Sequence, residues 1–443
     1  MSLLTRGTLW LGLYFHLIVL PLVVCGVWPG GNTGRPFATQ FGIACGYAAL
    51  TILVLEFALI SKIHAVSGVF GQDALQFFHR QMGLLATLLL AVHAALMLNG
   101  GYPLAWLNPI AADAPWAMRW GAIAGWAVGL LILLSMCRRQ LRVPYDWWQL
   151  SHGALAEIAV VAAFAHIVLF GGYSVNPPVR ILLAGYALLF LALRIWFQWI
   201  KPWRMWSQPW EVVTNVAELG DSHTLTLRPI GHPGFVFEPG QFAWLCTGRT
   251  PFHKDRHPIS MSSPAFDEPG HSVSFTIKAL GDWSGKIVPT LQPGHRVWLD
   301  GPYGVFTADR CQGPGYVLIG GGAGIAPLFS ICQTLAQRGD LRPVYLFFGG
   351  HDDSRLIFRE QLRQLAQRMN LHTVFALEEP GPDWTGERGY ITAAMMQKYL
   401  PSQFRRFPFF ICGPEPMVAA MEKLLPALGI PAAQIQTERF VMV

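Results

Sequence analysis

Six long apolar segments in the first 200 residues constrain the fold more than any other feature of the sequence. Each is long enough to cross a bilayer as an α-helix, which takes about 20 apolar residues. The chain has 32 Lys and Arg and 26 Asp and Glu residues, and only 15 of these charges fall within the first 200 positions. The sequence therefore predicts a membrane half followed by a soluble half. The six segments are 9–28, 38–61, 77–98, 116–136, 150–171 and 179–200.

Basic residues near the segment ends predict the orientation of the membrane half. They concentrate in the second and fourth connections and after the sixth segment, which by the positive-inside rule are cytoplasmic. Both termini are then expected in the cytoplasm. The run after Met1–Arg6 lacks a convincing cleavage site, so we expect a first spanning helix and not a signal peptide. The residues that set the orientation are Lys62, Arg80, Arg138, Arg139, Arg142, Lys201 and Arg204.

Charge and cysteine content exclude some classes of function. The net charge of +6 follows the membrane-flanking Lys and Arg residues, so it does not indicate nucleic-acid binding. The seven cysteines contain no C-x-x-C spacing, which argues against a disulfide framework or a zinc site.

Four histidines form two equally spaced pairs in the membrane half. His79 and His93 lie on the third segment, His152 and His166 on the fifth, and both separations are 14 residues. On a helix this spacing rises about 21 Å and returns to nearly the same face. The predicted topology makes these helices parallel, so His79 faces His152 near the cytoplasm and His93 faces His166 near the outside. Facing neutral imidazoles favour two stacked bis-histidine haems. Helix–helix hydrogen bonding is the alternative for any single histidine.

Other ionisable residues in the membrane half have a less definite role. Glu56 and Glu157 are expected to face the bundle interior and pair with polar neighbours, with a proton path as the less favoured alternative. His16 and His64 lack helical partners at matching depth, so we expect them to be structural.

The soluble half changes pattern twice. Short alternating runs with turn signals predict an antiparallel barrel of about 100 residues. From Tyr316 the pattern becomes strand, turn and helix, which predicts a doubly wound α/β domain. The barrel runs are Glu211–Val216, His223–Arg228, Phe242–Cys246, Val273–Leu280 and Arg296–Asp300. The α/β domain has strands Tyr316–Ile319, Val344–Phe348, Thr373–Leu377 and Phe409–Cys412, a helical run to Arg338, and a helix at Leu356–Met369.

A glycine-rich stretch directly follows the first of these strands and opens a helix. Glycines at such a turn let backbone N–H groups approach a pyrophosphate at the helix N-terminus. A purely structural turn with tight strand–helix packing is the alternative. The stretch is Gly320-Gly321-Gly322-Ala323-Gly324-Ile325-Ala326-Pro327.

The motifs of the soluble half fall in an order that is similar to the ferredoxin–NADP reductase type of flavoprotein. Joined to six helices with two histidine pairs, this order resembles the ferric reductase and NADPH oxidase superfamily, over almost the whole chain. Besides the glycine-rich stretch, the motifs are Glu238-Pro239-Gly240-Gln241-Phe242, Arg256-His257-Pro258-Ile259-Ser260-Met261-Ser262-Ser263, Lys278-Ala279-Leu280-Gly281-Asp282-Trp283-Ser284, Asp300-Gly301-Pro302-Tyr303-Gly304 and Cys412-Gly413-Pro414-Glu415-Pro416-Met417.

The resemblance implies three domains of a multi-domain membrane protein. Residues 1–205 would form a six-helix all-α transmembrane di-haem domain, 206–310 an antiparallel β-barrel that binds FAD, and 311–443 an α/β doubly wound domain that binds NAD(P)H. It also implies that His79, His93, His152 and His166 ligate the two b-type haems. A bacterial inner membrane is the expected location, with the dehydrogenase half in the cytoplasm.

The resemblance implies a flavin site in the barrel. His257-Pro258-Ile259-Ser260 is similar to the HPF(T/S) flavin motif, with Ser260 bonding the isoalloxazine near N5. Ile259 would lie against the ring, where an aromatic residue is commoner. Arg256 and the turn at Gly281, Asp282, Trp283 and Ser284 would hold the flavin phosphates, and Lys278 belongs to the same cofactor-binding set.

It likewise implies a nicotinamide site. The dinucleotide pyrophosphate would bind at Gly320, Gly321, Gly322, Gly324, Ile325 and Pro327. Cys412 would lie near the nicotinamide C4, beside Gly413, Pro414 and Glu415. Phe440 resembles the aromatic residue that shields the flavin, although Val441-Met442-Val443 extend beyond it.

The choice between NADPH and NADH is left open by the residues themselves. Arg355 and Arg388 suit a 2′-phosphate, whereas Asp352 and Asp353 suit a free ribose hydroxyl. The resemblance favours NADPH.

The implied activity is electron transfer from NADPH through FAD and the two haems to an acceptor outside. Oxygen, giving superoxide, is the first expected acceptor, and a ferric chelate, a quinone or a partner protein are the rivals. A rival of another class is a membrane-anchored flavin reductase whose helices only tether it. Membrane lipid and a small-molecule acceptor are the expected partners.

Overall fold

The computed structural model describes residues 3–28, 34–60, 63–252 and 256–439. The chain divides after Gln198 into two compact units.

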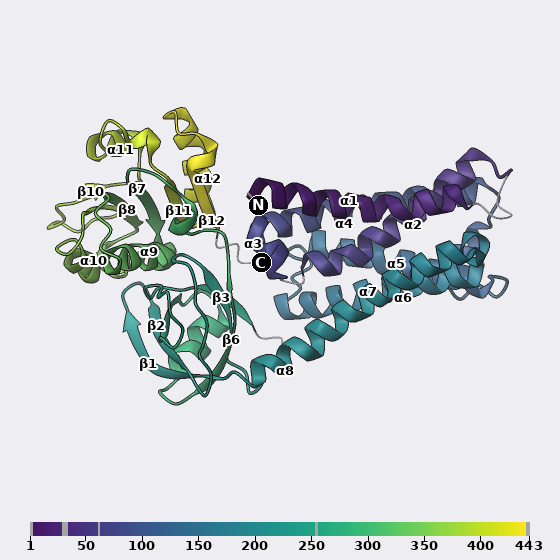
Figure 1. Cartoon of the computed structure of the whole chain (residues 1–443), viewed down its shortest axis with the longest axis horizontal. Coiled ribbons are helices and arrows are strands. Elements are labelled where there is room, and N and C mark those ends of the chain that lie inside the picture. Colours follow the sequence, from purple (N-terminus) through teal and green to yellow (C-terminus); the bar gives the residue numbers. More distant parts are fainter. Residues whose placement is uncertain (1–2, 29–33, 61–62, 253–255, 440–443) are drawn as a thin grey trace. The chain divides into compact units, whose positions relative to one another are not determined.

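The first unit is a bundle of long helices that run side by side (Figure 1). Six stretches of the described residues are long and apolar enough to cross a membrane, which confirms the six predicted spans. The sixth continues from α7 through a π-helical turn at Trp196–Ile200 into α8. The helices are α1 (Leu3–Val27), α2 (Phe37–Leu59), α3 (His64–Phe70), α4 (Gln72–Asn99), α5 (Trp116–Cys137), α6 (Tyr145–Phe170), α7 (Pro177–Ile195) and α8 (Lys201–Trp206).

The helix α2 lies at the centre of the bundle. Its Ile52 and Val54 are fully buried, whereas Leu9 and Leu13 of α1 are exposed. Exposed leucines on a helix of this composition suit contact with lipid, because lipid tails are as apolar as the side chains. The bundle therefore has one buried helix that can carry polar groups inward.

The helices α4 and α6 begin earlier than predicted, because their first turns are polar and fall outside the apolar runs. This extension makes the two helices equivalent. His79 and His152 each lie seven residues after the first residue of their helix.

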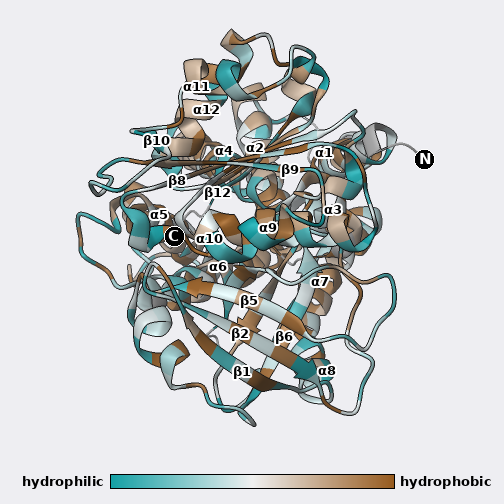
Figure 2. Ribbon diagram, turned by 90° about the vertical axis from the view of Figure 1, so that its left-hand side faces the viewer, coloured by the Kyte–Doolittle hydropathy of each residue, from teal (hydrophilic) through white to brown (hydrophobic). Residues whose placement is uncertain are grey.

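The second unit contains a six-stranded antiparallel sheet in the order β4-β3-β6-β1-β2-β5. Its two edges meet at a bridge between Met261 and Phe275, which closes the sheet into a barrel. Figure 2 shows β1, β2, β5 and β6 side by side in this barrel. The strand β4 was not predicted, because Pro258 makes the run atypical of a strand. The strands are β1 (Trp210–Glu218), β2 (Ser222–Pro229), β3 (Phe242–Cys246), β4 (His257–Ser260), β5 (Val273–Lys278) and β6 (Arg296–Tyr303).

A six-stranded parallel sheet follows, in the order β10-β9-β8-β7-β11-β12. Figure 2 shows α9 and α10 on one face and α11 and α12 on the other, and a hydrophobic core fills each side. This is the predicted doubly wound fold. Its elements are β7 (Tyr316–Gly321), α9 (Ile325–Gln337), β8 (Val344–Gly350), α10 (Arg359–Leu365), β9 (Leu371–Leu377), β10 (Glu387–Arg388), α11 (Ala393–Tyr399), β11 (Phe409–Gly413), α12 (Glu415–Ala427) and β12 (Ile435–Arg439).

The sheet changes direction next to β7. Successive strands β8 and β9 extend to one side of β7, and β11 and β12 lie on its other side. In open α/β sheets, ligands bind at such a switch point, at the carboxyl ends of the strands. The glycine-rich turn after β7 and the Cys412-Gly413-Pro414 segment after β11 both lie at this point.

Candidate cofactor sites

The four histidine rings meet in the two pairs that the spacing predicts. His79 of α4 faces His152 of α6 with the ring centroids 6.2 Å apart, and His93 faces His166 at 6.3 Å. Among the described residues, no group of three or more His, Cys, Asp or Glu side chains could hold a metal ion by itself.

The Nδ1 atom of every one of these rings contacts an oxygen of a neighbouring helix. His93 Nδ1 lies 2.8 Å from the Gly42 carbonyl oxygen, and His166 Nδ1 lies 2.8 Å from that of Ala117. A carbonyl oxygen only accepts hydrogen bonds, so each Nδ1 carries the hydrogen and donates it. The Nε2 lone pair is then left for another partner.

The other pair has side-chain partners. His152 Nδ1 lies 3.1 Å from Ser135 Oγ, and that hydroxyl donates to the Leu131 carbonyl at 2.8 Å. Because its one hydrogen is committed, Ser135 accepts from His152. His79 Nδ1 contacts the Glu56 carboxylate, which is buried. Nδ1 is thus the donor in His93, His166 and His152, and in His79 it contacts an acidic oxygen.

Two glycines make room for the outer pair of rings. A Cβ at Gly46 would lie 3.0 Å from His93 Nδ1, and a Cβ at Gly121 would lie 2.9 Å from His166 Nδ1. Each glycine follows the accepting carbonyl by four residues, one turn along α2 or α5. A small residue there lets the ring reach the carbonyl, as small-xxx-small motifs let membrane helices approach. Sequence reasoning missed this feature, although the Gly42–Gly46 and Ala117–Gly121 spacings carry the signal.

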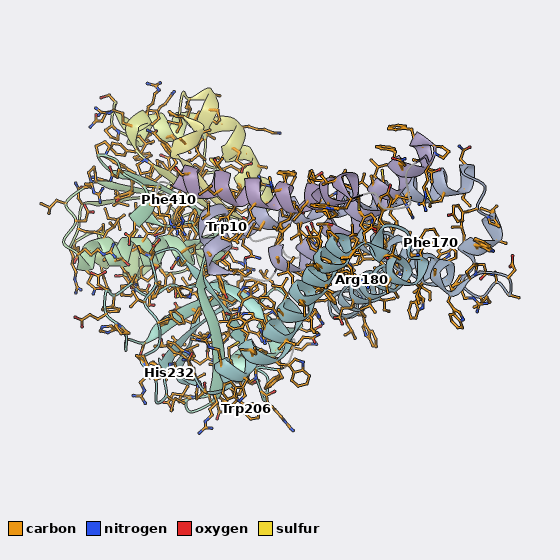
Figure 3. All side chains as sticks on the ribbon, turned by 45° about the vertical axis from the view of Figure 1, so that its right-hand side comes forward. Trp10, Phe170, Arg180, Trp206, His232 and Phe410 are labelled. Atoms are coloured by element: carbon orange, nitrogen blue, oxygen red, sulfur yellow. The ribbon has the colours of Figure 1, made fainter. Side chains whose placement is uncertain are left out.

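A cavity of about 420 Å³ lies between the helices beside the outer pair. Both His93 and His166 line it, together with mostly apolar residues and Arg35. Phe170, at the end of α6, also contributes to its wall and is labelled in Figure 3. The cavity can hold a flat apolar molecule with its polar groups toward Arg35.

In the second unit, Ser260 lies beside the switch point of the parallel sheet. Its buried hydroxyl donates to Glu438 Oε2 at 3.2 Å. Cys412 is fully buried and pairs across the sheet with Gly320 on one side and Glu438 on the other. The structure therefore brings Ser260 and Cys412 toward one carboxylate. Sequence reasoning missed Glu438, which had no motif to mark it.

Packing accounts for part of the glycine-rich turn. A Cβ at Gly324 would lie 2.1 Å from the Cys412 carbonyl oxygen, and one at Gly321 would lie 2.7 Å from Met417 Sδ. Gly322 differs, because its φ is +56° and a Cβ there would have Lys278 Nζ as its neighbour at 3.9 Å. The structural alternative thus explains Gly321 and Gly324, while Gly322 faces a cation.

The turn after β5 is held by internal contacts. Ser284 Oγ accepts from the backbone N–H groups of Leu280 at 2.9 Å and Gly281 at 3.0 Å. Trp283 stacks on His257 with centroids 3.8 Å apart. Asp282 lies 2.6 Å from Lys286, and this hydrogen-bonded cation holds the pKa of the carboxyl below its usual value. The structure therefore brings His257 and the 281–284 turn together.

A buried polar network lies behind Arg256. Lys201 Nζ lies 2.8 Å from Asp300 Oδ2 and donates to the Tyr303 hydroxyl at 2.8 Å. That hydroxyl donates to Asp300 Oδ1 at 2.7 Å, and burial, followed by the Asp300 charge, raises the pKa of Tyr303. Arg256 itself donates to the Pro251 carbonyl at 2.5 Å. Asp300 and Tyr303 of this motif thus belong to a buried network with Lys201, and the sequence did not predict that Lys201 contacts them.

Two predicted ligands are engaged in ion pairs. Arg355 Nη1 lies 2.7 Å from Asp221, and its Nε lies 3.9 Å from Asp352. Glu415 pairs with Arg439 of β12. Phe440 lies outside the described residues.

Two family models match this chain. A ferric reductase like transmembrane component matches residues 45–164, and an oxidoreductase NAD-binding domain matches residues 318–423. The chain therefore contains a ferric reductase-like transmembrane region and an oxidoreductase NAD-binding region. This confirms the relationship that the motifs indicate, and it makes the protein an integral membrane oxidoreductase with a ferric reductase-like membrane domain.

Individual relatives match about half of the chain or less. The reductase component of propane 2-monooxygenase from Rhodococcus jostii is 32% identical over 228 residues, which are 50% of this chain and 60% of that protein. NADH-cytochrome b5 reductase 1 from Aspergillus terreus is 31% identical over 158 residues, 34% of this chain and 53% of that protein. The solved ferredoxin reductase in carbazole 1,9a-dioxygenase is 27% identical with a TM-score of 0.46, covering 53% of this chain and 69% of that one. The chain thus spans less than two thirds of the two curated relatives.

Proposed function

We propose that this ferric reductase-like protein moves electrons from NAD(P)H, through FAD and two b-type haems, to an acceptor on the far side of the membrane. The first acceptor we propose is O₂, giving superoxide. The observation that carries the proposal is the pairing of four histidine rings, at two levels, between the helices α4 and α6.

The ring separations fit a metal between each pair. A histidine nitrogen binds a first-row metal at about 2.0–2.1 Å, and the ring centroid lies about 1.1 Å beyond it, so two axial rings have centroids about 6.3 Å apart. The pairs lie at 6.2 and 6.3 Å.

The tautomers support the same assignment. A metal-binding histidine almost always donates its second ring N–H to a carbonyl or carboxylate, which fixes the ring and leaves the other nitrogen as the ligand. His93 and His166 use backbone carbonyls, His152 uses Ser135 and His79 uses Glu56. The apolar cavity beside His93 and His166 would accept a macrocycle, and Arg35 would meet its carboxylates.

In the dehydrogenase half, the protein would bind and orient two nucleotides. When bound, FAD accepts a hydride and passes electrons singly, and haems relay single electrons. Ser260 would hold the edge of the flavin ring, with Glu438 fixing its hydroxyl. Lys278 would meet the dinucleotide pyrophosphate above Gly322, and Cys412 would border the nicotinamide at the switch point.

The number of spans supports the direction of transfer. Six crossings return the chain to the side on which it started, which is also the side where α4 and α6 begin. His79 and His152 lie near those beginnings. The soluble half would therefore share a side with this inner pair, and His93 and His166 would face the opposite leaflet.

The two candidate acceptors rest on different grounds. O₂ is proposed from the two histidine ligands of each haem, and a ferric chelate from the description of the matched family. If two histidines held each haem iron, O₂ would have to accept its electron without binding to the metal. The matched family description favours a ferric chelate as the second candidate. To separate them, the purified full chain with FAD is reduced by NADPH without oxygen and then mixed with air-saturated buffer or a ferric chelate. Fast haem reoxidation by air with proportionate superoxide supports the first candidate, and slow reoxidation by air with fast reoxidation by the chelate favours the second.

A further inference from the structure

We infer that Glu56 sets the reduction potential of the haem at His79 and His152 below that of the haem at His93 and His166. The inference rests on the proposed function, because it concerns the groups that those histidines would hold. It assigns a role to a buried acid on α2 that touches a ligand ring without itself binding the metal.

Glu56 lies in the last turns of α2, the most buried helix of the bundle, and is itself only 6% exposed. Its Oε2 contacts His79 Nδ1, and its Oε1 accepts from the Tyr14 hydroxyl at 3.3 Å. With Nε2 of His79 bound to a metal, Nδ1 carries the ring hydrogen and donates it, and Tyr14 also donates, so the carboxyl group receives two hydrogen bonds, as an ionised carboxylate does. The carboxylate is therefore directed at the ligand ring from the side opposite the metal.

The partners of the other three rings are neutral oxygen atoms. They belong to the Gly42 carbonyl, the Ala117 carbonyl and the Ser135 hydroxyl. The two pairs have nearly the same ring separation and lie on the same two helices, and a carboxylate at Nδ1 occurs in the inner pair only. The inner pair has a carboxylate at one Nδ1 atom, whereas both Nδ1 atoms of the outer pair contact carbonyl oxygens.

The negative charge of Glu56 acts on the reduction potential of the inner site in two ways, and both lower it. A carboxylate that accepts the Nδ1 hydrogen makes the imidazole a stronger electron donor to its metal. The negative charge also attracts the oxidised metal, which carries one more positive charge, and the low dielectric of the bundle strengthens this attraction. Both effects stabilise the oxidised state, so both lower the reduction potential of the inner site.

The consequence is a downhill step from the inner to the outer site. An electron at the lower-potential inner pair moves spontaneously to the outer pair, whose carbonyl partners add no charge. Glu157 offers a contrast on α6, because Arg194 pairs with it and balances its charge. Glu56 itself contacts His79 and Tyr14, and among the described residues it has no Arg or Lys ion-pair partner.

The test is a redox titration of the full-length protein in detergent, with mediators and the haem absorbance as readout. Glu56→Gln keeps the size of the side chain and can still accept from His79, but it removes the charge. We expect two components in the parent protein and an upward shift of the lower one in the variant. At a fixed potential its ratio of reduced to oxidised haem should rise at least tenfold, about 59 mV for a one-electron couple.

Three further variants of the chain test whether the shift comes from Glu56 and belongs to the inner site. His93→Ala should leave a single component at the lower potential, which assigns that component to the inner site. Ser135→Ala removes the neutral partner of His152 and should shift the same component by much less. Glu157→Gln, which alters a paired acid, should move neither component.

The outcomes separate the inference from the proposed function. Two bound haems with unchanged potentials in Glu56→Gln, or a shift of the outer component only, would overturn the inference and leave the electron path intact. A parent protein that binds no haem would contradict the function, and the inference with it. If Glu56→Gln does not fold, Glu56→Asp keeps the charge but draws it back from His79, and an unchanged potential there would also overturn the inference.

Discussion

Ser260 and Glu438 show what a single contact adds to a motif. The motif indicates that the serine belongs to a flavin site, but the Ser260 Oγ–Glu438 Oε2 hydrogen bond of 3.2 Å explains how its hydroxyl is oriented. Glu438 is 178 residues away in sequence and lies in the last described strand. Only the pairing of β12 with β11 brings it beside Cys412.

We therefore expect Ser260→Ala to slow flavin reduction by NAD(P)H. Loss of one orienting contact in a reaction that depends on close alignment costs about 10- to 100-fold in rate. The rate is measured by stopped-flow bleaching of the flavin, with the FAD content determined separately. Ser402→Ala is the matched control, since that exposed hydroxyl donates to its neighbour Gln403 on the surface of the unit. Equal rates in Ser260→Ala and the parent would contradict the assignment.

The histidines permit a second prediction for single residues. His166→Ala should remove the outer haem and abolish electron delivery to an external acceptor, while NAD(P)H still reduces the flavin and the inner haem. The measurement is anaerobic haem reduction followed by acceptor-dependent reoxidation. Full delivery to the external acceptor in this variant would show that the outer pair is not on the path.

At the scale of elements, helix approach in the membrane is set by small residues. The ring of His166 reaches the Ala117 carbonyl because Gly121 has no side chain, and His93 reaches the Gly42 carbonyl past Gly46. Both glycines thus lie where a ring of one helix meets the neighbouring helix, α6 against α5 and α4 against α2. These positions make the glycines part of the ligand geometry.

Gly121→Ala should consequently disturb the outer haem alone. The added methyl would lie 2.9 Å from His166 Nδ1, so the ring would have to move and its carbonyl contact would lengthen. We expect the haem content to fall from two per chain toward one, measured as haem released per protein. Gly125→Ala is the control on the same helix, since a Cβ there meets nothing within 4 Å. Equal haem content in the two variants would contradict this role.

The sequence predicted the elements whose patterns are local and missed those that depend on distant contacts. Six apolar runs defined six spans, and the alternating runs defined five of the six barrel strands. The strand β4 was missed because Pro258 sits inside it, at the edge of the sheet where a missing N–H is tolerated. The helix α10 is shorter than predicted, because Leu356, Ile357 and Phe358 enter the core before the helix begins.

The same division applies to the sites. Fourteen-residue spacing was enough to predict the histidine pairs, since helical geometry is regular. The Nδ1 partners were not predictable in this way, because Gly42, Glu56, Ala117 and Ser135 belong to neighbouring helices. Their contacts depend on how those helices pack, and Glu56 was expected only to meet some polar neighbour.

For the whole molecule, the proposed electron path requires one orientation in the membrane. We expect the loop between α4 and α5 to face outward and the parallel sheet to face the cytoplasm. Ile110→Cys should then react with a membrane-impermeant maleimide in intact cells, and Leu341→Cys should react only after the cells are opened. These positions are 83% and 88% exposed, and the seven native cysteines are buried or half-buried. Labelling of Leu341→Cys in intact cells would contradict this orientation, because it would place the parallel sheet outside the cell.

The central claim is that NAD(P)H reduces two histidine-held haems through the flavin of the same chain. The most direct measurement is the haem spectrum of the purified full-length protein with FAD, recorded without oxygen before and after NADPH and then after dithionite. The account predicts two six-coordinate haems per chain and a reduction by NADPH that matches the reduction by dithionite. A protein without haem, or haems that stay oxidised while NADPH bleaches the flavin, would contradict it.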